Sequence, residues 1–180
     1  MMRHFLNFIL ATILTICSHN YLFAQVDTSI VLETKIYAKH LDSLDKLPHP
    51  QDFGFMTSIA DGVIKRDDIV VGGFGVYTLS NAKGDTALRI EYHDNLDINI
   101  YKTYYFKNNK LIFATVELHD GRDNMKSIYH KEEIYAENKI IWTTTQKEKR
   151  ANRYLDKTNF ALYDDGLKFL ADFMKENNRR

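Results

Sequence analysis

The chain has few of the residues that impose covalent or backbone constraints. Its 180 residues include one cysteine, two prolines, eight glycines and one tryptophan. The cysteine is Cys17, so residues 25–180 contain no thiol, which excludes a disulfide framework, a cysteine nucleophile and a zinc–thiolate site there. Lysine plus arginine and aspartate plus glutamate number 24 each, without a basic stripe, which argues against binding to nucleic acid or to a polyanionic membrane surface. Packing must hold such a fold, and 11 phenylalanines and 11 tyrosines supply the apolar area.

Residues 1–24 have the pattern of a signal peptide. A positively charged start precedes an almost wholly apolar run over residues 5–17, which is too short and wrongly flanked for a spanning helix. Lipoprotein processing at Cys17 is the alternative, but Ile16 is larger than the residue such processing prefers. We therefore expect an exported protein, periplasmic or extracellular, in which residues 25–180 form one domain with no further transmembrane segment.

The apolar pattern predicts an α+β domain. Helical spacing indicates one helix over residues 28–47, which Pro48 and Pro50 end, and a second that starts at Asp164 or Asp165. Segments rich in β-branched and aromatic residues lie between them, at residues 69–80, 87–93, 97–106, 110–119, 126–135 and 139–146. The connections are too short for crossovers, so the strands should run antiparallel. We expect a six-stranded antiparallel β-meander with the N-terminal and C-terminal helices packed on one face.

A glycine-rich stretch, Gly72–Gly75, lies inside the first predicted strand. No Lys-Ser/Thr pair follows it and no helix is predicted after it, which excludes a phosphate-binding loop. We expect a bent or bulged strand, or an edge that another backbone approaches closely.

One segment of the predicted sheet is repeated. Residues 105–115, YFKNNKLIFAT, align with residues 134–144, IYAENKIIWTT, and each copy reads as a β-hairpin around an Asn-Lys turn. This hairpin resembles uncharacterised exported bacterial proteins built on repeated aromatic hairpins, and over residues 101–145 it is similar to the YYxNGKL units of MORN-type repeats. The spacing here is longer and Asn109 or Asn138 replaces the turn glycine, so the resemblance transfers no functional residue.

The register follows from where apolar side chains fall. Three-residue loops ending at Asn109 and Asn138, and a loop over residues 94–96, gather the apolar residues on one face. A two-residue turn at Asn108 would pair Ile100 with Glu117, which the hydrophobic pattern disfavours. The predicted core face is Leu88, Ile90, Tyr92, Ile98, Ile100, Tyr104, Ile112, Ala114, Val116 and Leu118, with Lys102 as its one polar member.

The opposite face carries the candidate binding residues. These are Tyr101, Tyr105, Phe113 and Trp142. Aromatic side chains on a non-core face would bind sugar rings, a peptide strand or a second subunit. They would instead form a second core layer if residues 51–68 or 147–163 fold over them. We predict an exported non-catalytic binding or assembly module with a protein, peptide or glycan partner, and with a homodimer as one arrangement.

The polar end of the same face offers a metal site as the alternative. The register places His93, Asp97 and His119 in one row over three neighbouring strands, and two histidines with an aspartate suit zinc or a related divalent metal. A divalent-metal-dependent hydrolase is therefore the second hypothesis, and no cofactor is predicted beyond that metal. Glu91 and Glu117 resemble a glycosidase carboxylate pair, but such pairs on exposed strands usually belong to a solvated surface.

Overall fold

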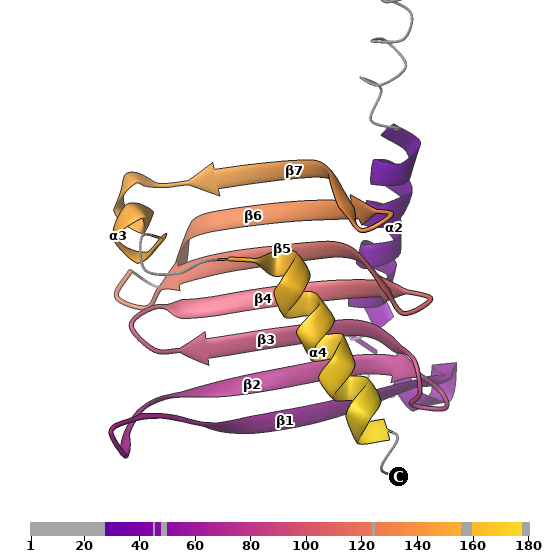
Figure 1. The fold of residues 1–180 in the computed structure, drawn as a ribbon, viewed down its shortest axis with the longest axis horizontal. Coiled ribbons are helices and arrows are strands. Elements are labelled where there is room, and N and C mark those ends of the chain that lie inside the picture. Colours follow the sequence, from indigo (N-terminus) through magenta and orange to yellow (C-terminus); the bar gives the residue numbers. More distant parts are fainter. Residues whose placement is uncertain (1–27, 45, 48–49, 124, 156–159, 178–180) are drawn as a thin grey trace, which may run out of the picture.

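The computed structural model describes residues 28–44, 46–47, 50–123, 125–155 and 160–177 (Figure 1). Within this part of the chain one antiparallel sheet has seven strands in chain order, which confirms the α+β meander but corrects the predicted strand count of six. The strands are β1 (Phe55–Arg66), β2 (Ile69–Asn81), β3 (Ala87–Asn95), β4 (Asn99–Lys107), β5 (Lys110–Asp120), β6 (Lys126–Ala136) and β7 (Lys139–Lys147). The helices are α2 (Thr28–Leu44), α3 (Asn152–Leu155) and α4 (Leu162–Asn177), with 3-10 turns η1 (Pro50–Phe53) and η2 (Lys149–Ala151).

The predicted signal peptide at residues 1–24 lies outside the described residues, so its assignment stays a prediction. None of the described helices combines the length and the apolar character that a membrane crossing requires.

β1 is the strand that the sequence pattern missed. It lies at the edge of the sheet and pairs only with β2, and most of its side chains are exposed. An exposed edge strand needs no apolar alternation, and Asp61-Gly62, a dipeptide typical of turns, sits inside it. The burial that makes a strand recognisable in sequence is therefore absent here.

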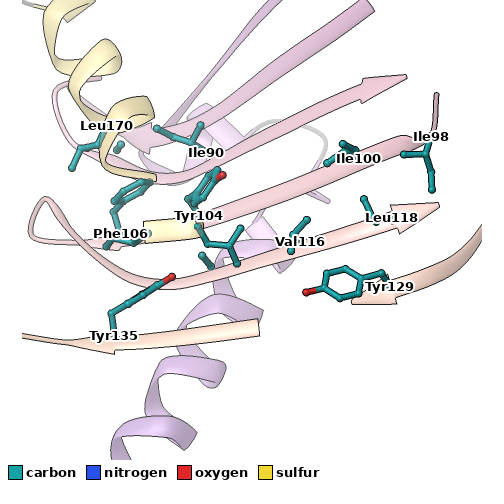
Figure 2. Close-up of a cluster of buried hydrophobic side chains, with 14 of the residues drawn as sticks. Ile90, Ile98, Ile100, Tyr104, Phe106, Val116, Leu118, Tyr129, Tyr135 and Leu170 are labelled. Carbon is teal, nitrogen blue, oxygen red and sulfur yellow. The ribbon is translucent and has the colours of Figure 1, made fainter. Parts of the chain in front are cut away.

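The two long helices pack on opposite faces of the sheet, so the expectation that both cover one face is wrong (Figure 1). α4 runs diagonally across the face that carries Tyr104 and Phe106, and Figure 2 shows Leu170 of α4 within this cluster. α2 crosses the other face at the end where the β4–β5 and β6–β7 turns lie. Its buried residues Ala38 and Leu41 pack there in a second cluster with strand residues.

The repeated segments are hairpins, as predicted, but with two-residue turns. Both turn residues have positive φ: Asn108 (53°) and Asn109 (56°) in one, and Glu137 (50°) and Asn138 (64°) in the other. Such turns match the right-handed twist of the flanking strands. The β1–β2 hairpin turns in the same way, with positive φ at residues 67 and 68.

Each of these hairpins carries a bulge at the same distance from its turn. Between β4 and β5, Phe106 pairs with Leu111 and Tyr105 pairs with Phe113, which leaves Ile112 as the extra residue. The extra residue restores the side-chain parity that a three-residue loop would give, so Ile100 faces Leu118 and the core face is correct in its middle. Near the turn the prediction is wrong, because Ile112 packs on the α2 side and Leu111 on the α4 side.

Two further register errors have similar causes. Ser80 pairs with Ala87 and Leu79 with Arg89, so Leu88 is the extra residue of another bulge and packs on the α2 side. The β3–β4 loop comprises residues 96–98 rather than 94–96, because the last pair before it is Asn95 with Asn99. This shift preserves the faces but moves every cross-strand neighbour between β3 and β4.

Lys102, the polar exception on the predicted core face, has a partner that the sequence did not identify. Its Nζ lies 2.5 Å from Oδ2 of Asp165, in the first turn of α4. The side chain is 16% exposed and lies between the rings of Tyr92 and Phe160. The ion pair thus ties β4 to the start of α4 and gives the largely buried ammonium group a partner.

Candidate functional site

The α2 side of the sheet is divided into a covered part and a bare part. The strand pairing places one row of side chains beneath α2: Leu79, Arg89, Tyr105, Phe113, Ile134 and Trp142. Tyr105 and Phe113 are only 6% and 5% exposed, so the structure does not leave the predicted aromatic surface open at these two residues. The second core layer, which is the alternative to a binding surface, is present, but α2 forms it rather than residues 51–68 or 147–163.

Polar contacts fix α2 on this row. Asp42 of α2 accepts hydrogen bonds at Oδ1 from Arg89 (2.9 Å) and from the Tyr105 hydroxyl (3.0 Å). Arg89 is 2% exposed, and its second carboxylate is Glu91 at 3.1 Å. Burial, reinforced by the neighbouring Asp42 charge, raises the pKa of Tyr105 far above its ordinary value, so the hydroxyl stays a donor. The Tyr37 hydroxyl adds a hydrogen bond to the Phe106 carbonyl at 2.9 Å.

Beyond this row the sheet face is open and polar. Two cavities of about 390 and 340 Å³ lie there, and they share Thr103, Thr115 and Glu117 in their walls. They form one depression that runs from the flank of α2 toward the β3–β4 loop, and we name it the open groove. Its floor consists of Glu91, His93, Tyr101, Thr103, Thr115, Glu117 and His119.

Tyr101 is the central ring of the open groove. It is 39% exposed and lies between two imidazoles on neighbouring strands, with ring centroids 6.1 Å from His93 and 5.0 Å from His119. Gly75, opposite His93 on β2, makes room for that imidazole, because a Cβ at this position would overlap it. The glycine-rich stretch thus begins beside a β-bulge at Val71, as the bulged-strand prediction has it, while the group that approaches Gly75 is a side chain rather than the expected backbone.

A chain of hydrogen bonds borders the groove on β5 and β6. His119 Nε2 lies 2.6 Å from Glu117 Oε2, and its Nδ1 lies 2.8 Å from the Met125 carbonyl oxygen. His130 Nδ1 lies 3.0 Å from Glu117 Oε1, and its Nε2 lies 3.2 Å from Glu132 Oε1. Both nitrogens of each imidazole therefore face an oxygen atom, and the tautomer decides which of them donates.

The chain continues to α2 and to the single tryptophan. Lys35 Nζ donates to Glu132 Oε2 at 2.9 Å and lies 4.1 Å from the centre of the Trp142 ring. Burial alone would raise the pKa of Glu132, but the hydrogen bonds from Lys35 and His130 outweigh it and hold that pKa below its ordinary value. Trp142, one of the predicted binding residues, is thus half-buried beside the groove and next to a cation.

The predicted metal residues are not brought together. His93 and His119 both line the open groove, but Tyr101 lies between their strands. Asp97 belongs to the β3–β4 loop and lines a different cavity. Within the described residues no group of three or more His, Cys, Asp or Glu side chains is placed to hold a metal ion. His119 would also have to leave Glu117 or Met125 before it could become a ligand.

Sequence reasoning found part of the groove. The parity of the strands placed Tyr101, His93, His119 and Glu117 on the non-core face, and the structure agrees. It missed Lys35, because a lysine among the polar residues of an amphipathic helix has no local signal for a partner 97 residues away.

Comparison with known proteins gives no relative to argue from. No protein-family model, no curated protein and no solved structure matches the chain. The geometry of the site is thus the basis for a functional interpretation.

Proposed function

We propose that the protein is an exported, non-catalytic binding module that holds its ligand in the open groove beside α2. The observation that carries the proposal is the exposed ring of Tyr101, set between two imidazoles in a depression that α2 leaves uncovered. Export rests on the signal-like residues 1–24. Tyr101 is the one predicted aromatic binding residue whose ring is available on the bare part of the face.

The arrangement of hydrogen bonds favours binding over catalysis. A general base needs a free nitrogen or carboxylate oxygen within reach of the substrate proton. Both ring nitrogens of His119 and of His130 already face acceptors, and both oxygens of Glu117 face imidazoles. These groups form a closed network that fixes the groove wall, as expected of a preorganised binding surface.

The electrostatics of the groove favour a neutral ligand. Each carboxylate that lines it has a partner: Arg89 beside both Asp42 and Glu91, two imidazole rings beside Glu117, and Lys35 beside Glu132. What remains for a ligand is the Tyr101 ring, the hydroxyls of Thr103 and Thr115, and carboxylate oxygens as additional acceptors. Ring faces with hydroxyl donors and acceptors suit a sugar ring, so a neutral glycan is the ligand we propose.

The test is a titration of the purified chain with neutral trisaccharides of glucose and of N-acetylglucosamine. The single tryptophan, Trp142, lies at the end of the network that borders the groove, so its fluorescence should change saturably when a ligand binds. Tyr101→Ala should abolish the response and Tyr101→Phe should retain it, because stacking uses the ring rather than the hydroxyl. The control Ile140→Ala removes an exposed side chain near the β6–β7 turn and should bind as the parent does.

Two outcomes would overturn the proposal. If no trisaccharide changes the fluorescence or the backbone amide shifts of β4, the groove does not bind neutral glycans. If the sugars are cleaved and Glu91→Gln or Glu117→Gln stops the cleavage, the protein is a glycosidase and the binding-only assignment is wrong. Metal analysis before and after chelation tests the hydrolase hypothesis separately, because one tightly held divalent ion per chain would restore it.

A further inference from the structure

Another cavity, separate from the open groove, lies at the far end of the sheet, away from α2. It has a volume of about 590 Å³, and three segments that are distant in sequence form its walls. The β3–β4 loop contributes Leu96, Asp97 and Ile98, the turn after β5 contributes Arg122, and α3 contributes Arg153 and Tyr154. We name it the end cavity.

Two guanidinium groups lie at this cavity and keep N–H donors that a ligand can use. Arg122 Nη2 donates to the Tyr154 hydroxyl at 2.9 Å, and the Arg153 guanidinium lies 4.7 Å from the centre of the Tyr154 ring. Both approach the buried carboxylate of Asp120, at 3.5 Å from Arg122 and 3.7 Å from Arg153. These separations are longer than a good charge-assisted hydrogen bond, and the Arg122 and Arg153 side chains are 73% and 56% exposed.

A third arginine shares the same carboxylate. Arg150 Nη1 lies 3.8 Å from Asp120, and its stronger partners are Asp123 and Glu148, both at 2.8 Å. Asp120 is therefore the carboxylate that all three arginines share. It accepts a hydrogen bond from the backbone N–H of Arg122, which lowers the pKa of Asp120 and keeps it ionised. With Arg150 neutralised elsewhere, Arg122 and Arg153 are the two cations that remain for a ligand in the end cavity.

We propose that the end cavity binds a small zwitterionic ligand, of which an apolar amino acid is the simplest example. The planar donors of Arg122 and Arg153 match a carboxylate group. Asp97 is exposed on the same lining and accepts the ammonium group. Leu96 and Ile98 supply the apolar wall for a side chain. Asp97 and Asp120 balance the two arginines in formal charge, which disfavours an anion with two negative charges such as phosphate.

The test follows backbone amides of the labelled full chain by NMR during titration with L-leucine to about 20 mM, which detects a millimolar Kd. Saturable shifts are expected at Asn99 and Gly121, which line the cavity. Arg122→Gln and Arg153→Gln should each weaken binding about tenfold or more. Both side chains are mostly exposed, so the fold should survive the changes. The control is Arg66→Gln, an exposed arginine at the end of β1, which should bind as the parent does.

The role of Asp97 is separable from that of the arginines. Asp97→Asn should weaken leucine binding and leave acetate binding equal or stronger, because acetate has no ammonium group. If leucine gives no saturable shift, or if acetate or phosphate binds the parent as tightly as leucine, the zwitterion proposal is overturned. Tyr101→Ala should leave leucine binding unchanged, so failure here and failure of the groove proposal are independent results.

Discussion

The two faces of the sheet carry helices of similar length, yet a buried core runs along β4 and β5 on one face and lies only beneath the helix on the other. On the α4 side, the diagonal helix covers one end of the sheet, and Tyr154, Leu155 and Phe160 pack against the core at the other. On the α2 side, the helix crosses the strands near one end and nothing among the described residues covers the rest of the face. The same meander therefore supports a continuous core on one side and a groove on the other.

The difference shows what determines whether a sheet face becomes core or site. Side chains point alternately to the two faces along every strand, so strand pairing alone does not decide which face becomes core. The angle at which a helix crosses, and the contacts that fix it there, decide the outcome. α2 is fixed across one row by Asp42, Tyr37 and Lys35, and the rows beyond it are polar because no helix covers them.

The sharpest test of this comparison uses two tyrosines on the same strand. Tyr104 faces α4 and is fully buried, and Tyr101 faces the groove. Tyr104→Ala should lower the free energy of unfolding by about 3–5 kcal/mol through loss of buried area and creation of a cavity. Tyr101→Ala should change it by less than about 0.5 kcal/mol. Urea unfolding measures both, and equal losses would show that the groove face is structural core.

A second test removes the anchor of α2. Asp42→Ala removes one of the carboxylates that contact the buried Arg89 and takes the acceptor from the Tyr105 hydroxyl. We expect a loss of about 2–3 kcal/mol, because a buried charge and a buried donor each lose a partner. Glu33→Ala, at an exposed position of the same helix, is the matched control and should cost under about 0.5 kcal/mol. Equal effects of the two variants would mean that helix propensity, not the anchor, holds α2.

A third test probes how closely α4 approaches its face. A Cβ added at Gly166 would lie 2.8 Å from side-chain atoms of Leu111 and Tyr104. Gly166→Ala should therefore destabilise by about 1–2 kcal/mol, since overpacking outweighs the helix propensity gained. Lys168→Ala, on the exposed side of the same helix, should be close to neutral. A stabilised Gly166→Ala variant would show that α4 can move away from the sheet without loss.

Much of the fold was predictable because the strands of the sheet interior alternate and the turns contain Asn and Asp. The bulges were not, since the extra residues Leu88 and Ile112 are apolar and would suit either face of a sheet that packs on both sides. Because apolar residues occur on both faces, the sequence did not indicate which face each helix covers, and the prediction placed both helices on one face. Tyr105 and Phe113 look the same in sequence whether they bind a ligand or lie under a helix.

The candidate site was predictable only in its strand residues. Parity along β4 and β5 placed Tyr101 and Glu117 on the non-core face, but the separation of Asp97 from His119 depends on where the β3–β4 loop begins. A shift of two residues in that loop keeps every face and changes every neighbour. A prediction that residues on different strands form one row of metal ligands is therefore less secure than a prediction of which face each residue occupies.

The smallest expected effect concerns the link between α2 and the groove. Lys35→Met keeps the apolar stem over Trp142 but removes the charge beside Glu132, so it should destabilise by about 0.5 kcal/mol near pH 7. The native pKa of Glu132 lies below its ordinary value of 4.5, so the stabilisation is present above that value and is lost as pH falls through the native pKa. The difference between parent and variant should thus shrink as the pH is lowered below 4.5, while the control Lys39→Met shows no such pH dependence. A difference that persists unchanged at low pH would assign the role of Lys35 to packing on the indole rather than to its charge, and the α2 flank of the groove would then hold its shape without the carboxylate.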